Sequence, residues 1–414
     1  MFVSSERGDR LRECAERFGT PLYVYDFGVI RERLDVLRRH LHPSISLFYS
    51  IKANPNTTVV RHIYEAGANL ELCSPLELDI ALTAGADPRR ILYVGPGKTE
   101  AELNRLLTLG VRYIVAESLQ ELELMNRLAG RKGVRADVGV RFNPKMAIHG
   151  ARLKMGGAAR QFGIDEEQAA DAVRLIEASP FLRLAGLHAY YGTRILSAET
   201  VAANMAYILG FAERTMAEHA LELDYIGLGG GFGVSYYEGE APLDLSELSR
   251  KSHGLLELFA GKHPGIRLLM ETGRYVVAES GTYLTRVLYT KQSQGKWFAV
   301  TDGGTNHHAA AGGAGSLMRR NFPVRAWTRE SGELREYAIA GPLCTPGDTL
   351  GDQVTLPPLE PGDLIGILAS GAYGLTMSPV LFLSHALPRE VLLLDEKPLV
   401  VREKYEYAVP ALRS

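Results

Sequence analysis

The chain has 414 residues, of which 46% are hydrophobic and 23% charged, and its formal net charge is −2. This balance is typical of a folded globular protein with a substantial core. The near-neutral charge argues against nucleic acid and against a charged membrane surface as partners. We therefore expect a small-molecule ligand and, from the length, two domains.

The first residues, MFVSSERGDR, contain no apolar signal region, and no stretch has the roughly 18 uncharged apolar residues that a membrane span needs. These features predict a cytoplasmic protein. Cys14, Cys73 and Cys344 are scattered, without Cys-x-x-Cys spacing. We therefore expect neither a disulfide framework nor a metal site.

Short strand-like runs alternate with amphipathic segments such as 101–109 and 119–128, which have helical i, i+3, i+4 spacing. The runs lie about 20 to 40 residues apart, enough for one crossover helix, which favours parallel pairing. Eight such units predict an α/β protein with a closed (β/α)8 barrel. The expected strands are Ile45–Ile51, Asn69–Cys73, Ile91–Val94, Tyr113–Ala116, Ala136–Phe142, Leu184–His188, Tyr225–Leu228 and Leu268–Glu271.

After about residue 276 the pattern changes to short strand-like runs broken by glycine and proline, such as GTYLTRVLYT and DLIGILASGAYG. This predicts a separate antiparallel β barrel or sandwich. The strand-like segment Pro21–Asp26 precedes the first barrel helix and is expected to join that domain. The predicted domains are 27–275 for the barrel, and 1–26 with 276–414 for the β domain.

In a barrel of this type the chemistry lies at the carboxyl ends of the strands, where the loops converge. A single charged residue that closes a strand is usually only a solvated end, but here many ends are polar. We therefore expect the site at this mouth. The polar ends are Lys52, Glu71 with Ser74, Arg141 with Asn143, His188, Gly229–Gly231 and Glu271–Arg274.

Lys52 closes the first strand, in FYSIKANPN. Partial desolvation would lower the pKa of its amine and suit it to form a Schiff base, whereas a snorkelling lysine is the structural alternative. The run IGLGGGFG, Ile226–Gly233, suits either a bound phosphate or a tight turn, and it does not fit G-x-G-x-x-G. Arg274 in ETGRY adds a cation. Lysine, glycines, arginine, histidine and carboxylate together describe a pyridoxal phosphate site.

Six motifs occur in the order found in fold-type III pyridoxal phosphate-dependent decarboxylases: FYSIKANPN, LHAYYGT, LGGGFG, ETGRY, GPLCTPGD and SGAYG. The chain resembles this family, which includes the ornithine and diaminopimelate decarboxylases, over nearly its whole length. The resemblance implies an alanine-racemase-like TIM barrel with a C-terminal β domain. Three segments look most similar to carrier-protein-linked L-glutamyl decarboxylases of secondary metabolite (butirosin) biosynthesis: KMGGAARQFG at 154–163, GPLCTPGD at 341–348 and SGAYGLTMSPV at 370–380.

The resemblance implies roles for individual residues. Lys52 forms the Schiff base, His188 stacks on the pyridine ring and Glu271 pairs with the ring nitrogen. Related racemases have an arginine at the last position, so glutamate favours decarboxylation. The residues implied for the phosphate are Thr193, Gly229, Gly230, Gly231, Gly273, Arg274 and Tyr373.

The resemblance also implies a head-to-tail homodimer in which Cys344 reaches the partner subunit's site and protonates the substrate carbon. Asp302 and Asp348 lie where the family binds the distal end of the substrate. Thr345 follows the cysteine, where diamino acid decarboxylases usually have an acidic residue that meets a distal ammonium. We therefore expect a carrier-tethered aminoacyl thioester such as L-glutamyl. Arg141 and Glu77 are expected to support the site. Arg319 with Arg320 could meet a carrier protein, although such a basic pair is usually only a solvated face.

Three alternatives stay open. A decarboxylase of free diaminopimelate, ornithine or lysine is the main one, because Asp302 leaves a carboxylate that a distal ammonium can use. A noncatalytic homologue that keeps only the fold is disfavoured by the intact set of Lys52, His188, Glu271, Arg274 and Cys344. An amino acid racemase is the third.

Overall fold

The computed structural model describes residues 5–145, 153–154, 161–314, 320–327 and 333–405. The chain divides into two compact units. The barrel unit comprises 33–235 and 241–275, and the β unit comprises 1–32, 236–240 and 276–414. Compared with the domains expected from the sequence, residues 27–32 and 236–240 group with the β unit.

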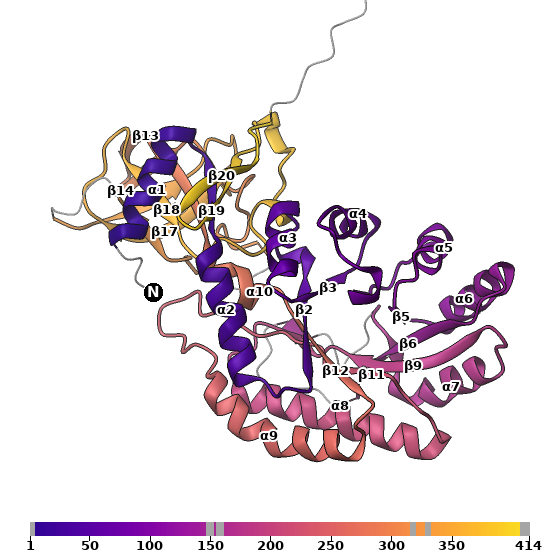
Figure 1. Ribbon diagram of the computed structural model, residues 1–414. Helices are drawn as coiled ribbons and strands as arrows, with labels where there is room; N and C mark the ends of the chain where they lie inside the picture. The colour runs from indigo at the N-terminus through magenta and orange to yellow at the C-terminus, as the bar shows by residue number, and fades with distance from the viewer. Residues whose placement is uncertain (1–4, 146–152, 155–160, 315–319, 328–332, 406–414) are drawn as a thin grey trace, which may run out of the picture. The chain divides into compact units, whose positions relative to one another are not determined.

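The barrel unit contains eight parallel strands in the order β5-β4-β3-β2-β12-β11-β9-β6, and a pairing between β5 and β6 closes the barrel. The eight strands expected from the sequence are all present, and their ends differ from expectation by at most two residues. Helices lie on the outside of the strands (Figure 1). The strands are β2 Ile45–Ser50, β3 Asn69–Leu72, β4 Ile91–Tyr93, β5 Tyr113–Ala116, β6 Ala136–Asn143, β9 Leu182–Ala189, β11 Tyr225–Gly227 and β12 Arg267–Thr272.

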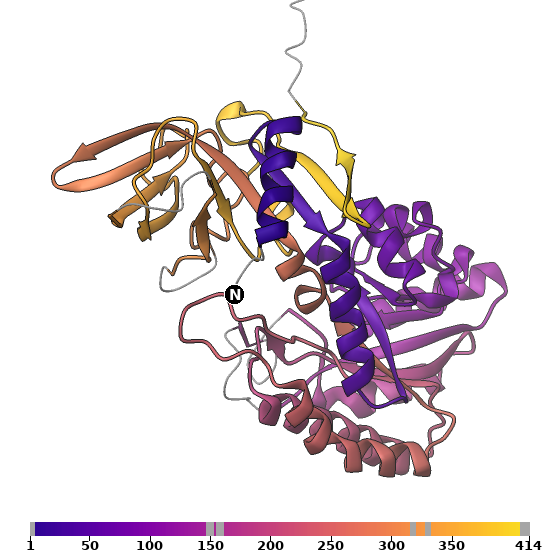
Figure 2. The ribbon, with the colours of Figure 1, turned by 60° about the vertical axis from the view of Figure 1, so that its left-hand side comes forward.

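Several barrel helices begin with a capping side chain just after a strand. Asn56, Ser74, Thr99 and Ser118 each accept a hydrogen bond from a backbone N–H in the first turn of the following helix. Such caps fix the short loops at the mouth. Helices α8 and α9 pack against each other (Figure 2). The helices are α2 Phe27–His40, α3 Thr57–Glu65, α4 Pro75–Thr83, α5 Glu100–Leu109, α6 Leu119–Lys132, α7 Ala169–Glu177, α8 Ala198–His219, α9 Leu245–Lys262 and α10 Arg274–Val277.

The barrel interior is filled by aliphatic and aromatic side chains, among them Tyr225, which meets Tyr113 edge-on with ring centroids 4.9 Å apart. Glycines make room for it on two neighbouring strands. A Cβ at Gly139 would lie 2.0 Å from the Tyr225 hydroxyl oxygen, and one at Gly186 would lie 2.4 Å from the ring carbon Cζ. The barrel is therefore a packed core whose chemistry is confined to the mouth.

The β unit contains a sheet in the order β17-β16-β14-β13-β1-β19-β20, with β18 paired to β13 and β15. Strands β13 and β14 form a hairpin over the two-residue turn Gln294–Gly295 (Figure 2). The elements are α1 Ser5–Phe18, β1 Leu22–Asp26, β13 Gly281–Ser293, β14 Lys296–Thr301, β15 Val324–Ala326, β16 Arg335–Ala340, β17 Thr349–Leu356, β18 Leu364–Ile367, β19 Arg389–Leu394 and β20 Lys397–Arg402.

The sheet of the β unit is mixed, whereas the sequence predicted an antiparallel one. Strand β1 runs parallel to β19, and β14 runs parallel to β16. Neither pair is joined by a tight turn, so nothing forces the two strands to run in opposite directions. As expected, the segment at 21–26 joins this unit, where β1 also pairs with β13.

The remaining elements are short. Over the described ranges, none of the helices combines the length and apolar character that a membrane crossing requires. The short elements are β7 Leu153–Lys154 paired with β10 Gly192–Thr193, β8 Ile164–Asp165 beside β6, and the 3-10 turns η1 Ile51–Ala53, η2 Pro88–Arg90, η3 Glu166–Gln168, η4 Ala278–Ser280, η5 Leu375–Met377 and η6 Phe382–Ser384.

Candidate active site

Lys52 lies in the single turn η1 directly after β2, at the mouth of the barrel. Its Nζ is 2.7 Å from Oε1 of Glu71, at the end of the neighbouring strand β3. The Glu71 side chain is fully buried, whereas that of Lys52 is 39% exposed. The carboxylate therefore fixes an amine that a ligand can still reach.

His188 and Glu271 form a buried pair across β9 and β12. The imidazole Nε2 contacts Oε1 of Glu271, and both side chains are almost wholly buried. Burial by itself raises the pKa of Glu271, but the charge and hydrogen bond of His188, with smaller contributions from Lys52 and Arg141, bring that pKa below its ordinary value. Glu271 is thus held as a carboxylate in a low-dielectric site.

Gly227, on β11 between β9 and β12, makes the position of the histidine possible. A Cβ there would lie 2.4 Å from Cδ2 of His188, which is its register partner on β9. We did not single out Gly227 from the sequence. The only signal was a glycine at the predicted strand's end, two residues before the glycine run.

The glycine run after β11 is required by close backbone approach. Gly229 and Gly231 have φ of +65° and +86°. A Cβ at Gly230 would lie 1.7 Å from the Glu271 carbonyl oxygen, and one at Gly231 would lie 2.0 Å from that of Gly192. Thr193 follows Gly192 in β10, so this residue borders the run.

Gly273 and Arg274 follow β12. A Cβ at Gly273 would lie 2.8 Å from that of Ala53, the neighbour of Lys52. Arg274 begins α10. The predicted cofactor residues of the barrel unit therefore lie on or directly after β2, β9, β10, β11 and β12. They supply a lysine amine, a buried carboxylate, an imidazole ring and glycine backbone. These are the groups that a pyridine aldehyde with a phosphate requires, so the residues fit pyridoxal phosphate.

Residues 27–278 match the family model described as the pyridoxal-dependent decarboxylase, pyridoxal binding domain. The chain belongs to the pyridoxal-dependent decarboxylase family. The predicted family, fold and cofactor are thereby confirmed.

Relatives of this decarboxylase span nearly its whole length. It is 38% identical over 397 residues to the L-glutamyl-[BtrI acyl-carrier protein] decarboxylase of Niallia circulans, covering 94% of this chain and 92% of that one. It is 31% identical to the diaminopimelate decarboxylase of Vibrio cholerae, covering 96% and 93%. The crystal structure of the Helicobacter pylori diaminopimelate decarboxylase with L-lysine superposes with a TM-score of 0.86 at 28% identity, covering 95% and 96%.

Two predicted substrate residues of this decarboxylase, in the β unit, have their carboxylates engaged. Asp302 accepts hydrogen bonds from the hydroxyls of Thr20 and Thr285 and from the backbone N–H of Arg286. Asp348 is 3% exposed and accepts from the N–H and hydroxyl of Thr305 and from the N–H of Leu343. Both carboxylates therefore join separate segments of the β unit.

The other predicted residues of the β unit lie on loops. Cys344 is exposed, and Thr345 beside it is half-buried, its N–H 2.7 Å from the Leu343 carbonyl oxygen. Tyr373 has a φ of +54°, an uncommon backbone conformation for a residue other than glycine. Such strain persists where the surroundings impose it and is often associated with ligand contact.

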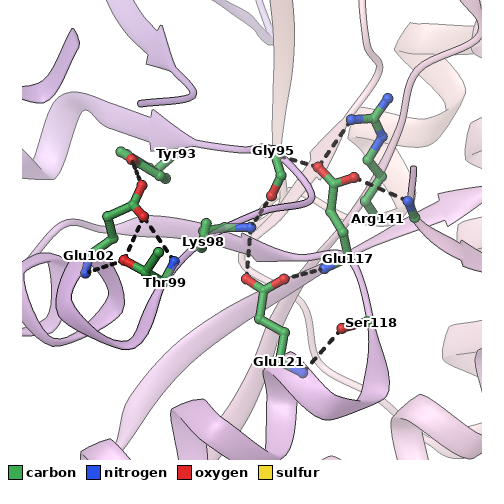
Figure 3. Close-up of polar contacts among 10 residues, drawn as sticks. Tyr93, Gly95, Lys98, Thr99, Glu102, Glu117, Ser118, Glu121 and Arg141 are labelled. Atoms are coloured by element: carbon green, nitrogen blue, oxygen red, sulfur yellow. Dashed lines mark hydrogen bonds and ion pairs between the residues drawn. The ribbon is translucent and has the colours of Figure 1, made fainter. Parts of the chain in front are cut away.

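The expected supporting residues lie in the barrel unit. Glu77 accepts the N–H of Cys73 at 2.7 Å, and burial raises its pKa. Arg141 is buried and belongs to a network of charges that the sequence analysis missed (Figure 3). Of the pair expected to meet a carrier, Arg320 contacts Glu240 at 3.6 Å, and Arg319 lies outside the described residues. So does most of the segment 154–163.

The missed residues are Lys98, Glu117 and Glu121, beyond the ends of β4 and β5. A signal was present, because these strands were predicted and charged residues follow both. Only the other strand ends were considered as candidates.

Proposed function

We propose that this enzyme removes the α-carboxylate of an aminoacyl group carried as a thioester on a carrier protein, such as L-glutamyl. The similarity to the Niallia circulans enzyme supports this proposal. The observation that carries it is that the carboxylates of Asp302 and Asp348 already accept hydrogen bonds from other residues of the β unit, together with the neutral Thr345.

A free diamino acid brings a second ammonium that must be desolvated at its distal end. Losing a charge-assisted hydrogen bond there costs about 1.5–3 kcal/mol. A tethered acyl chain has no such ammonium, so it does not need an acidic residue where this chain has Thr345. This reasoning favours the thioester over diaminopimelate, ornithine or lysine.

Pyridoxal phosphate, when bound, supplies an aldehyde that condenses with amines and a ring that accepts the electron pair left by departing CO₂. We assign Lys52 as the amine that holds the aldehyde, and His188 as the ring that packs against the pyridine. Glu271, kept ionised, holds a proton on the pyridine nitrogen. The glycine run with Gly273, Arg274, Thr193 and Tyr373 binds the phosphate.

The proposal includes a homodimer. Cys344 is exposed on its loop, and in our assignment its thiol donates a proton to the substrate carbon in the partner subunit's barrel. The carrier protein is the second partner, and Arg320 is one cation available to it.

The test is CO₂ release by purified holoenzyme from glutamyl thioester on a carrier protein, compared with free diaminopimelate, ornithine and lysine. We expect kcat/KM for the thioester to exceed that for any free diamino acid by about 10- to 100-fold, the equivalent of the lost hydrogen bond. An inert thioester beside a free diamino acid with kcat/KM near 10⁴ M⁻¹s⁻¹ would show that the substrate is free. Diaminopimelate decarboxylation, the activity named for other relatives, would then be the function.

A further inference from the structure

Four charged side chains are buried together, three from segments beyond β4 and β5 and one, Arg141, from β6 (Figure 3). Lys98 Nζ lies 2.7 Å from Oε1 of Glu121, with side chains 1% and 7% exposed. Arg141 Nη1 lies 3.1 Å from Oε1 of Glu117, with side chains 7% and 1% exposed. The backbone N–H of Glu117 donates to Oε2 of Glu121 at 3.0 Å, which joins the two pairs.

Glu117 is the junction of this network. Besides Arg141 it accepts the N–H of Gly95, beyond β4, at 2.7 Å and the N–H of Gly163, before β8, at 3.1 Å. Lys98 also donates to the Gly95 carbonyl oxygen. One carboxylate therefore ties together backbone after β4, backbone before β8 and the guanidinium on β6.

Net stability does not account for such a cluster. Desolvation of buried ion pairs largely cancels their attraction, and well-packed apolar side chains are often equally or more stabilising. Loss of one partner is nevertheless very costly, because it leaves an uncompensated buried charge. What the network does provide is a fixed position for each of its groups.

The group fixed at the edge of the cofactor site is Arg141. It is the register partner of His188 on the neighbouring strand. The rings of Phe162 and Tyr190 flank its guanidinium, with Cζ 4.9 and 5.9 Å from their centroids. Its charge also contributes to the lowered pKa of Glu271, so it acts on the site at a distance.

We propose that Glu117 is a positioning residue of the decarboxylase: it holds the Arg141 guanidinium beside His188. Glu121, which is paired with Lys98, fixes Glu117 in turn by accepting its backbone N–H. This inference rests on the proposed function. Arg141 acts on the site through its charge, so the effect depends on the charged and titratable groups around it. They are Glu117 after β5, His188 on β9 and Glu271 on β12, with Lys52 after β2 and Glu71 on β3 further around the mouth.

The test is a double-mutant cycle of Glu117→Gln and Arg141→Gln. Each single variant strands a buried charge, so its Tm should fall by about 10 °C, and the double variant should recover most of that loss because both charges are gone. If Glu117 acts through Arg141, each single variant lowers kcat about tenfold and the double variant also about tenfold, not a hundredfold.

A second measurement needs no substrate. Loss of a fixed cation raises the pKa of nearby acids, because their deprotonated forms lose a favourable interaction. In the double variant the lost Glu117 carboxylate acts in the opposite sense, but Arg141 is the member of the pair that acts on Glu271, so the pH midpoint of the bound cofactor's absorption should still move up, by at most about one unit. Glu102→Gln, a matched change at a carboxylate whose hydrogen bonds go to Tyr93 and Thr99, should lower Tm and leave kcat and the midpoint unchanged.

Multiplicative losses of kcat would overturn the inference, as would wild-type kcat and midpoint in the stable double variant. If Glu117→Gln does not fold, Arg141→Gln compared with the double variant decides: equal kcat supports the inference and a further tenfold loss refutes it. A wild-type enzyme that binds cofactor normally but releases no CO₂ from the thioester would refute the proposed substrate instead, while the midpoint still tests Glu117.

Discussion

The two sides of the barrel mouth are built in different ways. Beyond β11 and β12 the mouth is lined by glycine backbone, and a Cβ added at Gly230, Gly231 or Gly273 would lie 1.7 to 2.8 Å from a neighbouring atom. On β6 and beyond β4 and β5 the mouth is built from buried charged side chains. The first side, the backbone side, requires glycines that carry no side chain. The second, the charged side, requires each buried charge to keep its partner, so substitutions should disrupt the two sides in different ways.

Lys52 lies between the two sides, and its replacement should have the largest effect. Lys52→Ala removes the amine assigned to hold the cofactor, so kcat should fall by at least about 10³-fold. Borohydride reduction followed by peptide mapping should fix the cofactor on the Lys52 peptide of the wild type and on no peptide of the variant. Lys251→Ala, which loses surface ion pairs with Glu199 and Glu247, serves as control. Reduced cofactor bound to the Lys52→Ala chain would disprove the assignment.

The backbone side is tested by Gly230→Ala. The new Cβ would lie 1.7 Å from a carbonyl oxygen, so the turn must shift. We expect the dissociation constant of pyridoxal phosphate to rise about 100-fold, roughly 2.7 kcal/mol, in a fluorescence titration. Gly254→Ala on α9, where nothing lies within 4 Å, should instead stabilise the protein by about 0.5–1 kcal/mol. Unchanged cofactor affinity in Gly230→Ala would contradict the phosphate assignment.

Both sides belong to one subunit, whereas the thiol is assigned to the other. When Lys52→Ala and Cys344→Ala proteins are mixed in equal amounts, about half of the dimers are mixed and one of their two sites is intact. Activity should therefore recover to about a quarter of the wild-type value by this counting of sites. Absence of recovery, after labelled subunits are shown to exchange, would argue against shared sites.

The smallest expected effect concerns the stability of the protein at acid pH. The pKa of Glu271 is lowered in the folded state, so its stabilisation is complete above the unfolded value of about 4.3 and is lost as pH falls through the folded value. The wild-type Tm should fall more steeply below about pH 4.3 than that of Glu271→Gln, by a few degrees. Parallel profiles of the two proteins would mean that the pair with His188 does not hold this carboxylate ionised.

The backbone side could be predicted from the sequence more completely than the charged side. The eight strands are apolar runs with polar ends. The three successive glycines at 229–231 indicate by themselves that another part of the backbone or a ligand approaches closely. The contact between His188 and Glu271 spans 83 residues and follows only from the barrel order. The network around Glu117 was missed because charged residues after a strand are usually solvated, and only packing shows that these are buried.

The β unit shows the same limit. The resemblance placed Asp302 and Asp348 near the distal end of the substrate, and that role stays a prediction, but their hydrogen bonds could not be foreseen, because the donors are backbone N–H groups and threonine hydroxyls. Such donors are present in every sequence, so they leave no distinctive signal. Strand direction is equally invisible in hydrophobic periodicity, and the mixed sheet was therefore not anticipated.

The packing of Tyr225 makes positions 139 and 225 of the barrel depend on each other in evolution. An alanine at Gly139 would place its Cβ 2.0 Å from the tyrosine hydroxyl. Loss of that hydroxyl would leave space for the new methyl group, so Gly139→Ala should be tolerated far better together with Tyr225→Phe than alone. In related sequences, loss of the glycine at 139 should therefore be accompanied by loss of the tyrosine hydroxyl at 225. An alanine at 139 together with a tyrosine at 225 should be rare among them.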